Sequence, residues 1–370
     1  MKNPLDASVY TKRTVPKTHP VRGEFFRDQT AIIHSLPFRR LKHKTQVFFS
    51  PENDHVCTRI EHVLHVATIA ATICKGLNQS GWDLNPDMAY AIGLGHDIGH
   101  TPFGHAGEAV LNQKLKSDVK FMHEVNSYRV VEYLANDGKG MNLTYGVKDG
   151  IINHNGEKFE QYLEPGTTIN DLENIKDRTH YATSYEGCIT RFSDKIAYLG
   201  RDVEDAIIAG FISKKKIPDD IKKDLGTTNG QIIDGFVKDL IENSKKQSKV
   251  GFSDSMFDKL KALKEFNYHY IYNHRDILHY RKMGENILSE LFDYLIELFS
   301  DNGYDFKKYS SSRILLDNRF GSYLKTMKKF YSKGNNVPKL IVCDYIAGMT
   351  DNFALESIKQ ITIPSPIKFK

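Results

Sequence analysis

The sequence predicts an all-α protein, an HD-type helical core with a helical C-terminal extension and few or no strands. Apolar residues recur at helical spacing along most of the chain, capping residues precede several of these segments, and strand-type alternation is rare. We expect an N-terminal arm over residues 1–24, a catalytic core over residues 25–215, and a C-terminal helical region over residues 216–370 that packs on the core.

The composition is that of an ordinary soluble protein. Of the 370 residues, 40% are hydrophobic and 26% are charged, which is enough apolar surface for a large buried core. No secretory core or membrane span stands out, so we expect a cytoplasmic protein without a membrane partner. The four cysteines include no CxxC pair, which favours reduced thiols. The net charge of +5 suits an anionic ligand without demanding nucleic acid.

The stretch TRIEHVLHVATIAATICKGL, residues 58–77, predicts a buried helix. Thr58 and Glu61 have the spacing of a capping box, which marks a helix start. Apolar residues then occupy most faces of the helix, and such a helix belongs inside a protein. His62 is therefore expected in a buried position.

The stretch NPDMAYAIGLGHD, residues 85–97, predicts a second helix. Asn85 is the expected N-cap, and Pro86 suits the first helical position. The helix ends by delivering His96 and Asp97. The glycines and the proline within residues 99–104 then predict a sharp turn, after which EVNSYRVVEYLAND, residues 124–137, predicts another helix.

A third long helix is predicted by TSYEGCITRFSDKIAYLGRDVEDAIIAG, residues 183–210. Its expected capping box joins Thr183 to Glu186. The helical period places three polar residues on one face: Asp194, Tyr198 and Asp202. Lys195 follows roughly 100° around the helix from Asp194. The polar residues 155–184 before this helix predict a loop that acts as a lid or a subunit contact.

Four polar residues on these helices stand where their neighbours are apolar: His62, His96, Asp97 and Asp194. Burying unpaired carboxylates is costly, and a shared divalent cation removes that cost. Two imidazoles and two carboxylates suit Mn, Fe, Ni, Co or Zn, and Mg less well. The alternative is four separately satisfied core or capping residues, but the four together favour one metal site.

Six motifs follow one another in a fixed order between about Phe25 and Leu355. They are RRLKHKTQVF (39–48), TRIEHVLHV (58–66), HDIGHTPFGHAGE (96–108), HEVNSYRVVEYL (123–134), EGCITRFSDKIAYLGRDVEDA (186–206) and DYIAGMTD (344–351). In these motifs the chain resembles the HD-domain deoxynucleoside triphosphate triphosphohydrolases, the dGTPase-like proteins.

The resemblance implies a role for each matching residue. The implied metal ligands are His62, His96, Asp97 and Asp194, with one Mn or Mg ion per site expected first and Fe, Ni, Co or Zn as the other candidates. The implied catalytic residues are the pair His105 and Glu108, with His100 and His123 near the scissile phosphate. The implied substrate contacts are Arg59, Lys195, Tyr198 and Asp202 for the triphosphate or sugar, and Gln46 and Arg40 near the 3′-hydroxyl and the base.

The expected activity is hydrolysis of dGTP or several dNTPs at the α-phosphate, which yields a deoxynucleoside and inorganic triphosphate. A dNTP carries about four negative charges, so its site needs a cation and fixed basic donors. The resemblance also implies a homo-oligomer, with a hexamer as one candidate. A regulatory dNTP or single-stranded DNA is a further candidate partner, for which the lysine-rich residues 328–339 offer one surface if they are more than a solvated face.

Two other functions stay open at this point. One is a different HD phosphohydrolase or phosphodiesterase that acts on other nucleotides or on single-stranded nucleic acid. The other is a non-catalytic nucleotide sensor that has kept the fold. The sequence also leaves open the preferred base, the metal, and whether His105 acts as a base or as an acid.

Overall fold

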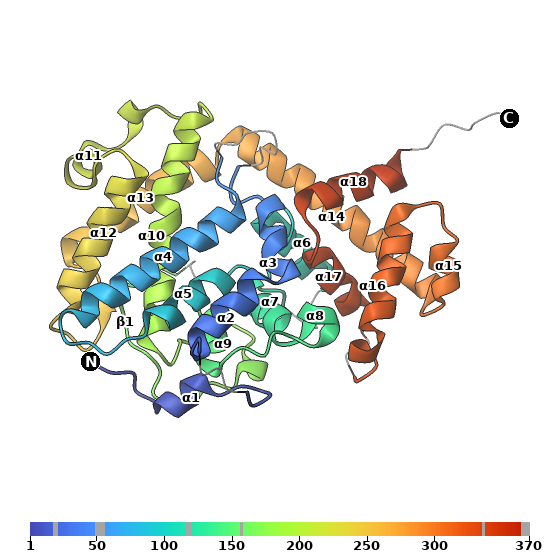
Figure 1. Ribbon diagram of the computed structural model, residues 1–370. Coiled ribbons are helices and arrows are strands. Elements are labelled where there is room, and N and C mark those ends of the chain that lie inside the picture. Colours follow the sequence, from blue (N-terminus) through green and yellow to red (C-terminus); the bar gives the residue numbers. More distant parts are fainter. Residues whose placement is uncertain (18–20, 49–55, 116–119, 156–157, 335–336, 364–370) are drawn as a thin grey trace.

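Helices make up nearly all regular structure in the computed structural model, which describes residues 1–17, 21–48, 56–115, 120–155, 158–334 and 337–363 (Figure 1). Within these ranges the strands are β1 (Tyr162–Leu163) and β2 (Val250–Gly251), which pair antiparallel. The prediction of an all-α fold is therefore confirmed.

The helices run in the following order. They are α1 (Ala7–Thr11), α2 (Glu24–Ile33), α3 (Leu36–Arg40), η1 (Leu41–His43), α4 (Arg59–Asn78), α5 (Pro86–Gly95), α6 (His105–Leu115), α7 (His123–Arg129), η2 (Val130–Leu134), α8 (Ala135–Gly138), α9 (Tyr145–Ile152), η3 (Leu172–Asn174), α10 (Tyr185–Ile208), η4 (Lys214–Lys216), α11 (Asp219–Leu225), α12 (Asn229–Ser244), α13 (Asp254–Asn267), η5 (Tyr268–Tyr272), α14 (Arg275–Asn302), α15 (Phe306–Ser310), α16 (Leu315–Tyr331), α17 (Pro338–Ala347) and α18 (Asp351–Thr362).

The centre of the fold is the packing of α4 against α5 and α10. By length and composition α4 could cross a membrane, but more than half of its most apolar window is buried among these neighbours. Such burial is the mark of a core helix. The expected capping box of Thr58 and Glu61 opens α4, and Asn85 caps α5 with Pro86 in its first turn. Both predicted helix starts are confirmed.

The predicted start of α10 is wrong by one residue. Ser184, not Thr183, is the N-cap, and its hydroxyl accepts a hydrogen bond from the amide of Gly187. Glu186 accepts instead from the backbone amide of Asn85 at 2.7 Å, and the hydroxyl of Thr183 donates to Asp149 at 2.8 Å. Contacts across the fold therefore replace the local capping box.

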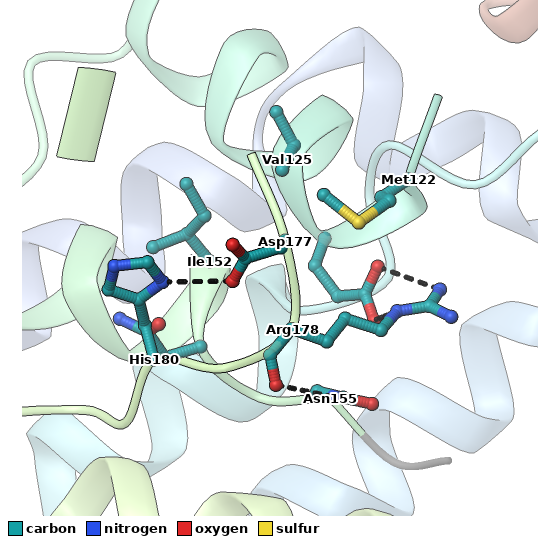
Figure 2. Close-up of a pocket in the computed structure, with 9 residues that line it drawn as sticks. Met122, Val125, Ile152, Asn155, Asp177, Arg178 and His180 are labelled. Carbon is teal, nitrogen blue, oxygen red and sulfur yellow. Dashed lines mark hydrogen bonds and ion pairs between the residues drawn. The ribbon is translucent and has the colours of Figure 1, made fainter. Parts of the chain in front are cut away.

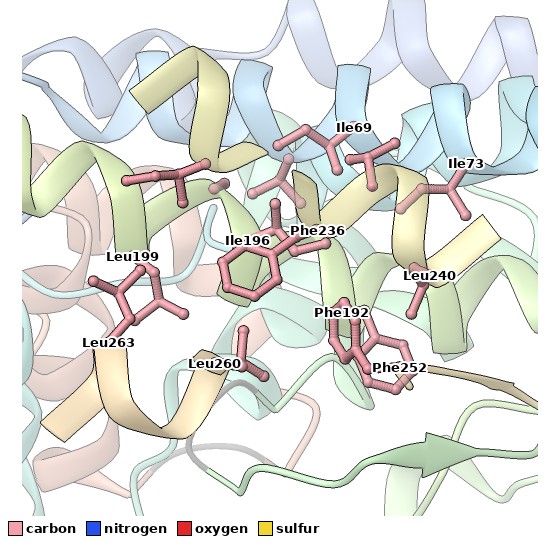
Figure 3. Close-up of a cluster of buried hydrophobic side chains, with 14 of the residues drawn as sticks. Ile69, Ile73, Phe192, Ile196, Leu199, Phe236, Leu240, Phe252, Leu260 and Leu263 are labelled. Carbon is pink, nitrogen blue, oxygen red and sulfur yellow. The ribbon is translucent and has the colours of Figure 1, made fainter. Parts of the chain in front are cut away.

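Two large apolar clusters join the C-terminal helices to the rest of the chain. The first lies between α4, α10, α12 and α13, where Figure 3 shows Ile69, Phe192, Phe236 and Leu260 from these four helices. The second packs side chains of α6 against α14, α16 and α17. The last residue of α6, Leu115, belongs to this second cluster, so the helix that begins at His105 rests on the C-terminal region.

The chain bends sharply between α5 and α6. A Cβ atom on Gly99 would lie 2.2 Å from the backbone nitrogen of Ser127, so only glycine fits against α7 there. Phe103 and Gly104 both have left-handed backbone conformations, with φ of 58° and 59°. The glycine at position 104 adopts this conformation without strain, and the bend returns His105 to the side of the molecule that holds His96.

Residues near the C-terminus hold this bend in place. The buried carboxylate of Asp351 accepts hydrogen bonds from the backbone amides of Phe103 at 3.1 Å and Thr45 at 2.9 Å, and from the Thr45 hydroxyl. The buried ammonium of Lys44 donates to the carbonyls of His100 and Ala347. The segments around residues 45 and 103 thus depend on helix α18, whose Asp351 follows Thr45 by 306 residues and Phe103 by 248 residues in the sequence.

We predict that Asp351→Ala lowers the free energy of unfolding by about 2–4 kcal/mol, because buried amides of Phe103 and Thr45 lose their acceptor. Urea denaturation of the full-length chain measures the change. Glu356→Ala is the matched control, since that exposed carboxylate on the same helix pairs only with exposed Lys359 among the described ion pairs. An equal loss in both variants would contradict the prediction.

Candidate metal centre and active site

Three of the four predicted metal ligands meet directly in the interior. The Nε2 atom of His62, from α4, lies 3.0 Å from Oδ1 of Asp194, from α10. The Nε2 atom of His96, at the end of α5, lies 3.8 Å from the same oxygen and 3.3 Å from Nε2 of His62. All three side chains are buried. The packing of α4, α5 and α10 therefore brings their ligand atoms to one point.

Asp97, the fourth predicted ligand, approaches the same ring nitrogen of His96 as Asp194 does. Its Oδ1 atom is 3.9 Å from Nε2 of His96 and 3.8 Å from Nε2 of His123, while Oδ2 pairs with the guanidinium of Arg59. Burial raises the pKa of Asp97, but Arg59 and the surrounding histidines more than offset this and hold it well below its usual range. Asp97 therefore presents one charged oxygen to the ligand cluster.

The orientation of His96 suits a metal ligand. Its Nδ1 atom lies 2.7 Å from the carbonyl of Gly93, so Nδ1 carries the proton and Nε2 keeps its lone pair. Burial lowers the pKa of His96 to about 4, which keeps the ring neutral. Two imidazoles and the Asp194 carboxylate converge here, with Oδ1 of Asp97 3.9 Å from Nε2 of His96. This mixed N/O donor set fits a divalent transition ion.

His154 is a neighbour of this cluster that the sequence analysis did not place in the site. Its Nδ1 atom contacts the carbonyl of Ile151 at 2.6 Å, and its ring centroid lies 4.9 Å from that of His96. Ligand atoms of His154, His96 and Asp97 are close enough to share an ion. The only sequence signal for it was its position after the apolar stretch GVKDGIINH, residues 146–154.

The other predicted histidines form a row beside the cluster. The rings of His100 and His123 stack at 4.5 Å with an interplanar angle of 18°, and His105 meets His100 edge-on at 5.3 Å. His100 and His123 are buried, whereas the side chain of His105 is 65% exposed. The row therefore runs from the interior beside Asp97 to the surface, where a substrate can enter.

Glu108 is paired with His123 more closely than with His105. Its Oε2 atom lies 2.8 Å from Nδ1 of His123 and 3.9 Å from Nδ1 of His105. Burial alone would lower the pKa of His123, but Glu124 and Glu108 outweigh it and raise that pKa to about 10. The expected pair of His105 and Glu108 is thus part of a three-residue group in which His123 holds a proton toward Glu108.

Arg178 and Glu124 complete this group, and sequence reasoning missed both. Arg178 donates to Glu108 at 3.0 Å and to Glu124 at 2.8 Å. It lines a small pocket with Met122, Val125 and Asp177, as Figure 2 shows. Because Arg178 belongs to the predicted loop 155–184, that loop does reach the site. Residues 156 and 157 of the loop lie outside the described residues.

A second cation between His100, His105, Glu108 and His123 is geometrically conceivable, because their ligand atoms lie within 4.8 Å of one another. The charges oppose it. One oxygen of Glu108 is bonded to His123, and the other is bonded to the guanidinium of Arg178. A cation would have to displace both positive partners, so this group is better suited to proton transfer.

The substrate contacts predicted on α10 are Lys195, Tyr198 and Asp202. Lys195 is fully buried, and burial lowers its pKa to about 8, although Nζ lies 3.4 Å from Glu160. Asp202, also buried, accepts a hydrogen bond from the hydroxyl of Tyr272, and burial raises its pKa to about 7. Tyr198 lies on the same helix face and packs beside the first apolar cluster. The stripe predicted along α10 is thus largely buried.

The two residues expected near the base and the 3′-hydroxyl are Gln46 and Arg40, and the backbone next to Gln46 accepts a hydrogen bond from Arg59 at the carbonyl of Thr45. The Oε1 atom of Gln46 is buried and has no hydrogen-bond partner within the described ranges, so it is available to a ligand. Arg40 donates to the carbonyl of Gly348 at 3.0 Å, which anchors it to the C-terminal region. A base-recognition role for Arg40 therefore stays a prediction.

Comparison with known proteins identifies the family of the chain. A family model described as HD domain matches residues 59–184, and one described as phosphohydrolase-associated domain matches residues 250–360. A deoxyguanosinetriphosphate triphosphohydrolase-like protein of Caldanaerobacter subterraneus subsp. tengcongensis is 40% identical over 347 residues, which cover 94% of this chain and 87% of the relative.

Two further relatives carry the same name. The one from Desulfatibacillum aliphaticivorans is 38% identical over 94% of this chain and 90% of the relative, and the one from Clostridium tetani is 35% identical over 93% and 87%. The chain therefore belongs to the deoxyguanosinetriphosphate triphosphohydrolase-like family of HD-domain phosphohydrolases.

Proposed function

We propose that this protein hydrolyses deoxynucleoside triphosphates, dGTP or several dNTPs, at the α-phosphate to a deoxynucleoside and inorganic triphosphate. One observation carries the proposal. Two groups of buried ligand atoms, His62 with His96 and Asp194, and Asp97 with His96 and His154, share His96, and the histidine row and the polar residues of α10 lie beside them. The names of the relatives point to the same substrate class.

The four predicted ligands would hold one divalent ion, with manganese or magnesium expected first and iron, nickel, cobalt or zinc as the other candidates. Such an ion would supply Lewis-acid stabilisation of charge on a phosphoryl oxygen. Arg59, whose guanidinium already pairs with Asp97, lies where it can also bind a phosphate oxygen beside that ion. Buried Lys195, next to Asp194, adds a second positive charge.

The histidine row would handle the protons. Because Nδ1 of His123 is bonded to Glu108, its Nε2 atom faces Asp97 and can hold a proton toward the leaving 5′-oxygen. His105 is exposed, so it can reach an attacking water and remove its proton. His100 stacks on His123 and limits the rotation of that ring.

The stripe on α10 would bind the sugar. Asp202 can accept a hydrogen bond from a ribosyl hydroxyl in addition to the one from Tyr272. The ring of Tyr198, one turn from Asp194, would crowd a 2′-hydroxyl, which is the proposed basis of selection for deoxynucleotides. A homo-oligomer, a hexamer among the candidates, and a regulatory dNTP or single-stranded DNA remain expectations. So does a cytoplasmic location.

The central test is product analysis. The metal-loaded chain is incubated with each of the four dNTPs, alone and in pairs, and the products are separated by chromatography. We expect inorganic triphosphate and the deoxynucleoside in equal amounts. Release of phosphate or pyrophosphate would indicate another HD phosphohydrolase, and binding without turnover across several metals would indicate a sensor.

We predict that Asp97→Ala loses bound metal and activity together, because one ligand oxygen and the partner of Arg59 both disappear. Metal content per chain and turnover are measured on the same preparation. His65→Ala on α4 is the control, since His65 belongs to none of the candidate metal-binding groups in the described part of the chain. Full metal content in Asp97→Ala would remove that residue from the ligand set.

We predict that His105→Ala keeps its metal but loses turnover by about 10²–10⁴-fold, the usual contribution of a general acid or base. The exposed side chain of His105 makes a folding defect an improbable cause. His43→Ala, another exposed histidine, serves as the control. Turnover close to that of the unmodified chain would exclude His105 from proton transfer.

A further inference from the structure

Arg191 is a buried arginine of α10 to which neither the sequence motifs nor the proposed mechanism gives a role. Its side chain is 2% exposed, and it precedes Lys195 by one helical turn. One terminal nitrogen, Nη2, donates to Glu160. Its Nε and Nη1 atoms are buried and have no hydrogen-bond partner among the described residues. Two unsatisfied N–H groups on one buried cation are costly, and they mark a place for an acceptor.

The charges around Arg191 point to an anion as that acceptor. Arg191 and Lys195 are two buried cations that share one carboxylate, Glu160, which lies 3.4 Å from Lys195 Nζ. The carboxylate of Asp194 also acts on Lys195. Aromatic rings flank the two cations: the ring centroid of Tyr181 is 5.2 Å from the Arg191 guanidinium, and that of Phe159 is 5.2 Å from Lys195 Nζ. A guanidinium offers a fork of donors that matches phosphate oxygens.

The register of α10 gives the direction in which this anion belongs. Arg191, Lys195, Tyr198 and Asp202 recur at spacings of four, three and four residues, so they lie on one face. In the proposed binding mode Tyr198 and Asp202 contact the sugar, and the α-phosphate lies near Asp194. The β- and γ-phosphates must then extend along α10 toward its N-terminal end, away from Tyr198. That direction leads to Lys195 and then to Arg191, about 6 Å farther along the axis.

We propose that Arg191 and Lys195 form the subsite for the terminal phosphate of the substrate, and that Glu160 occupies this subsite until a polyphosphate displaces it. The proposed function identifies the whole substrate as a dNTP; the binding of an anion by Arg191 and Lys195 does not depend on it. Glu160 follows Phe159, whose ring also lies 3.8 Å from Lys264 Nζ in a surface cleft with Lys261. Exposed Lys158, whose Nζ already lies 3.9 Å from Oε1 of Glu160, is a partner for the displaced carboxylate.

The test measures binding of inorganic triphosphate to the metal-loaded, full-length chain by calorimetry, after gel filtration removes excess metal. We expect Arg191→Gln to weaken binding by about tenfold or more, the effect of losing charge-assisted hydrogen bonds. We expect Glu160→Gln to strengthen it severalfold, because the internal competitor loses its charge. Lys238→Gln, which removes an equal charge at an exposed position of α12, should bind as the unmodified chain does.

Kinetics give a second readout that a merely structural role would not produce. With dGTP, Arg191→Gln should raise KM more than it lowers kcat, and its preference for dGTP over dGDP should narrow. Arg191→Lys keeps the positive charge but not the forked pair of donors. Its KM for dGTP should lie between the KM of the unmodified chain and that of Arg191→Gln. If thermal unfolding shows that Arg191→Gln does not fold, triphosphate binding by Arg191→Lys and by Glu160→Gln still tests the proposed subsite.

The proposal is overturned if neither Arg191 variant weakens triphosphate binding, or if Glu160→Gln binds it no more tightly. These outcomes are separable from the fate of the proposed function. A chain that fails to release triphosphate from any dNTP but shows the expected binding changes keeps the anion subsite and loses the reaction. A chain that performs the reaction with unchanged binding in all variants keeps the reaction and loses the subsite.

Discussion

The burial of ionised groups at the junction of α4, α5 and α10 is the constraint on which the rest of this structure depends. Asp97 and Asp194 lie in the interior, where an unpaired carboxylate is strongly destabilising. Arg59 neutralises the first, and the imidazoles of His62 and His96 surround the second. The three helices must therefore keep one relative position, and that position brings ligand atoms of His62, His96 and Asp194 within 4.8 Å of one another. Such a group of donors could hold a metal ion.

The C-terminal region serves this centre although it contributes none of the clustered ligands. Asp351 and Lys44 fix the bend that carries His100 to His105. Arg129, at the end of the helix that begins with His123, pairs with Asp344 of α17 at 2.8 Å. The bend that holds His100 and His105 is thus tied to the last helices by hydrogen bonds between charged side chains and the backbone, and the helix that begins with His123 is tied to them by an ion pair. Asp344 and Asp351 both belong to the region that matches the phosphohydrolase-associated domain, and their partners Phe103 and Arg129 belong to the region that matches the HD domain.

Residues 158–180 supply opposite charges to two parts of the site. Glu160 meets the cations of α10, while Arg178 meets the carboxylates of Glu108 and Glu124. In a low-dielectric interior each buried charge needs a partner even before a ligand arrives. The segment therefore supplies a negative charge to the cations of α10 and a positive charge to the carboxylates of Glu108 and Glu124. The cations of α10 and the carboxylates beside His123 thus each have their own counter-ion.

The sequence by itself determined the helices, the family and the residues that cluster, because capping, periodicity and ordered motifs are local signals. It predicted that His62 and Asp194 would meet, and they do. Only the tertiary structure decided which hydrogen-bond and ion-pair partners the polar side chains have. Ser184 replaced Thr183 as the cap because Asp149 and Asn85 compete for the polar groups there. Glu108 lies nearer His123 than His105, and Arg178 and His154 lie beside these histidines, because long-range packing sets distances that spacing along a chain does not encode.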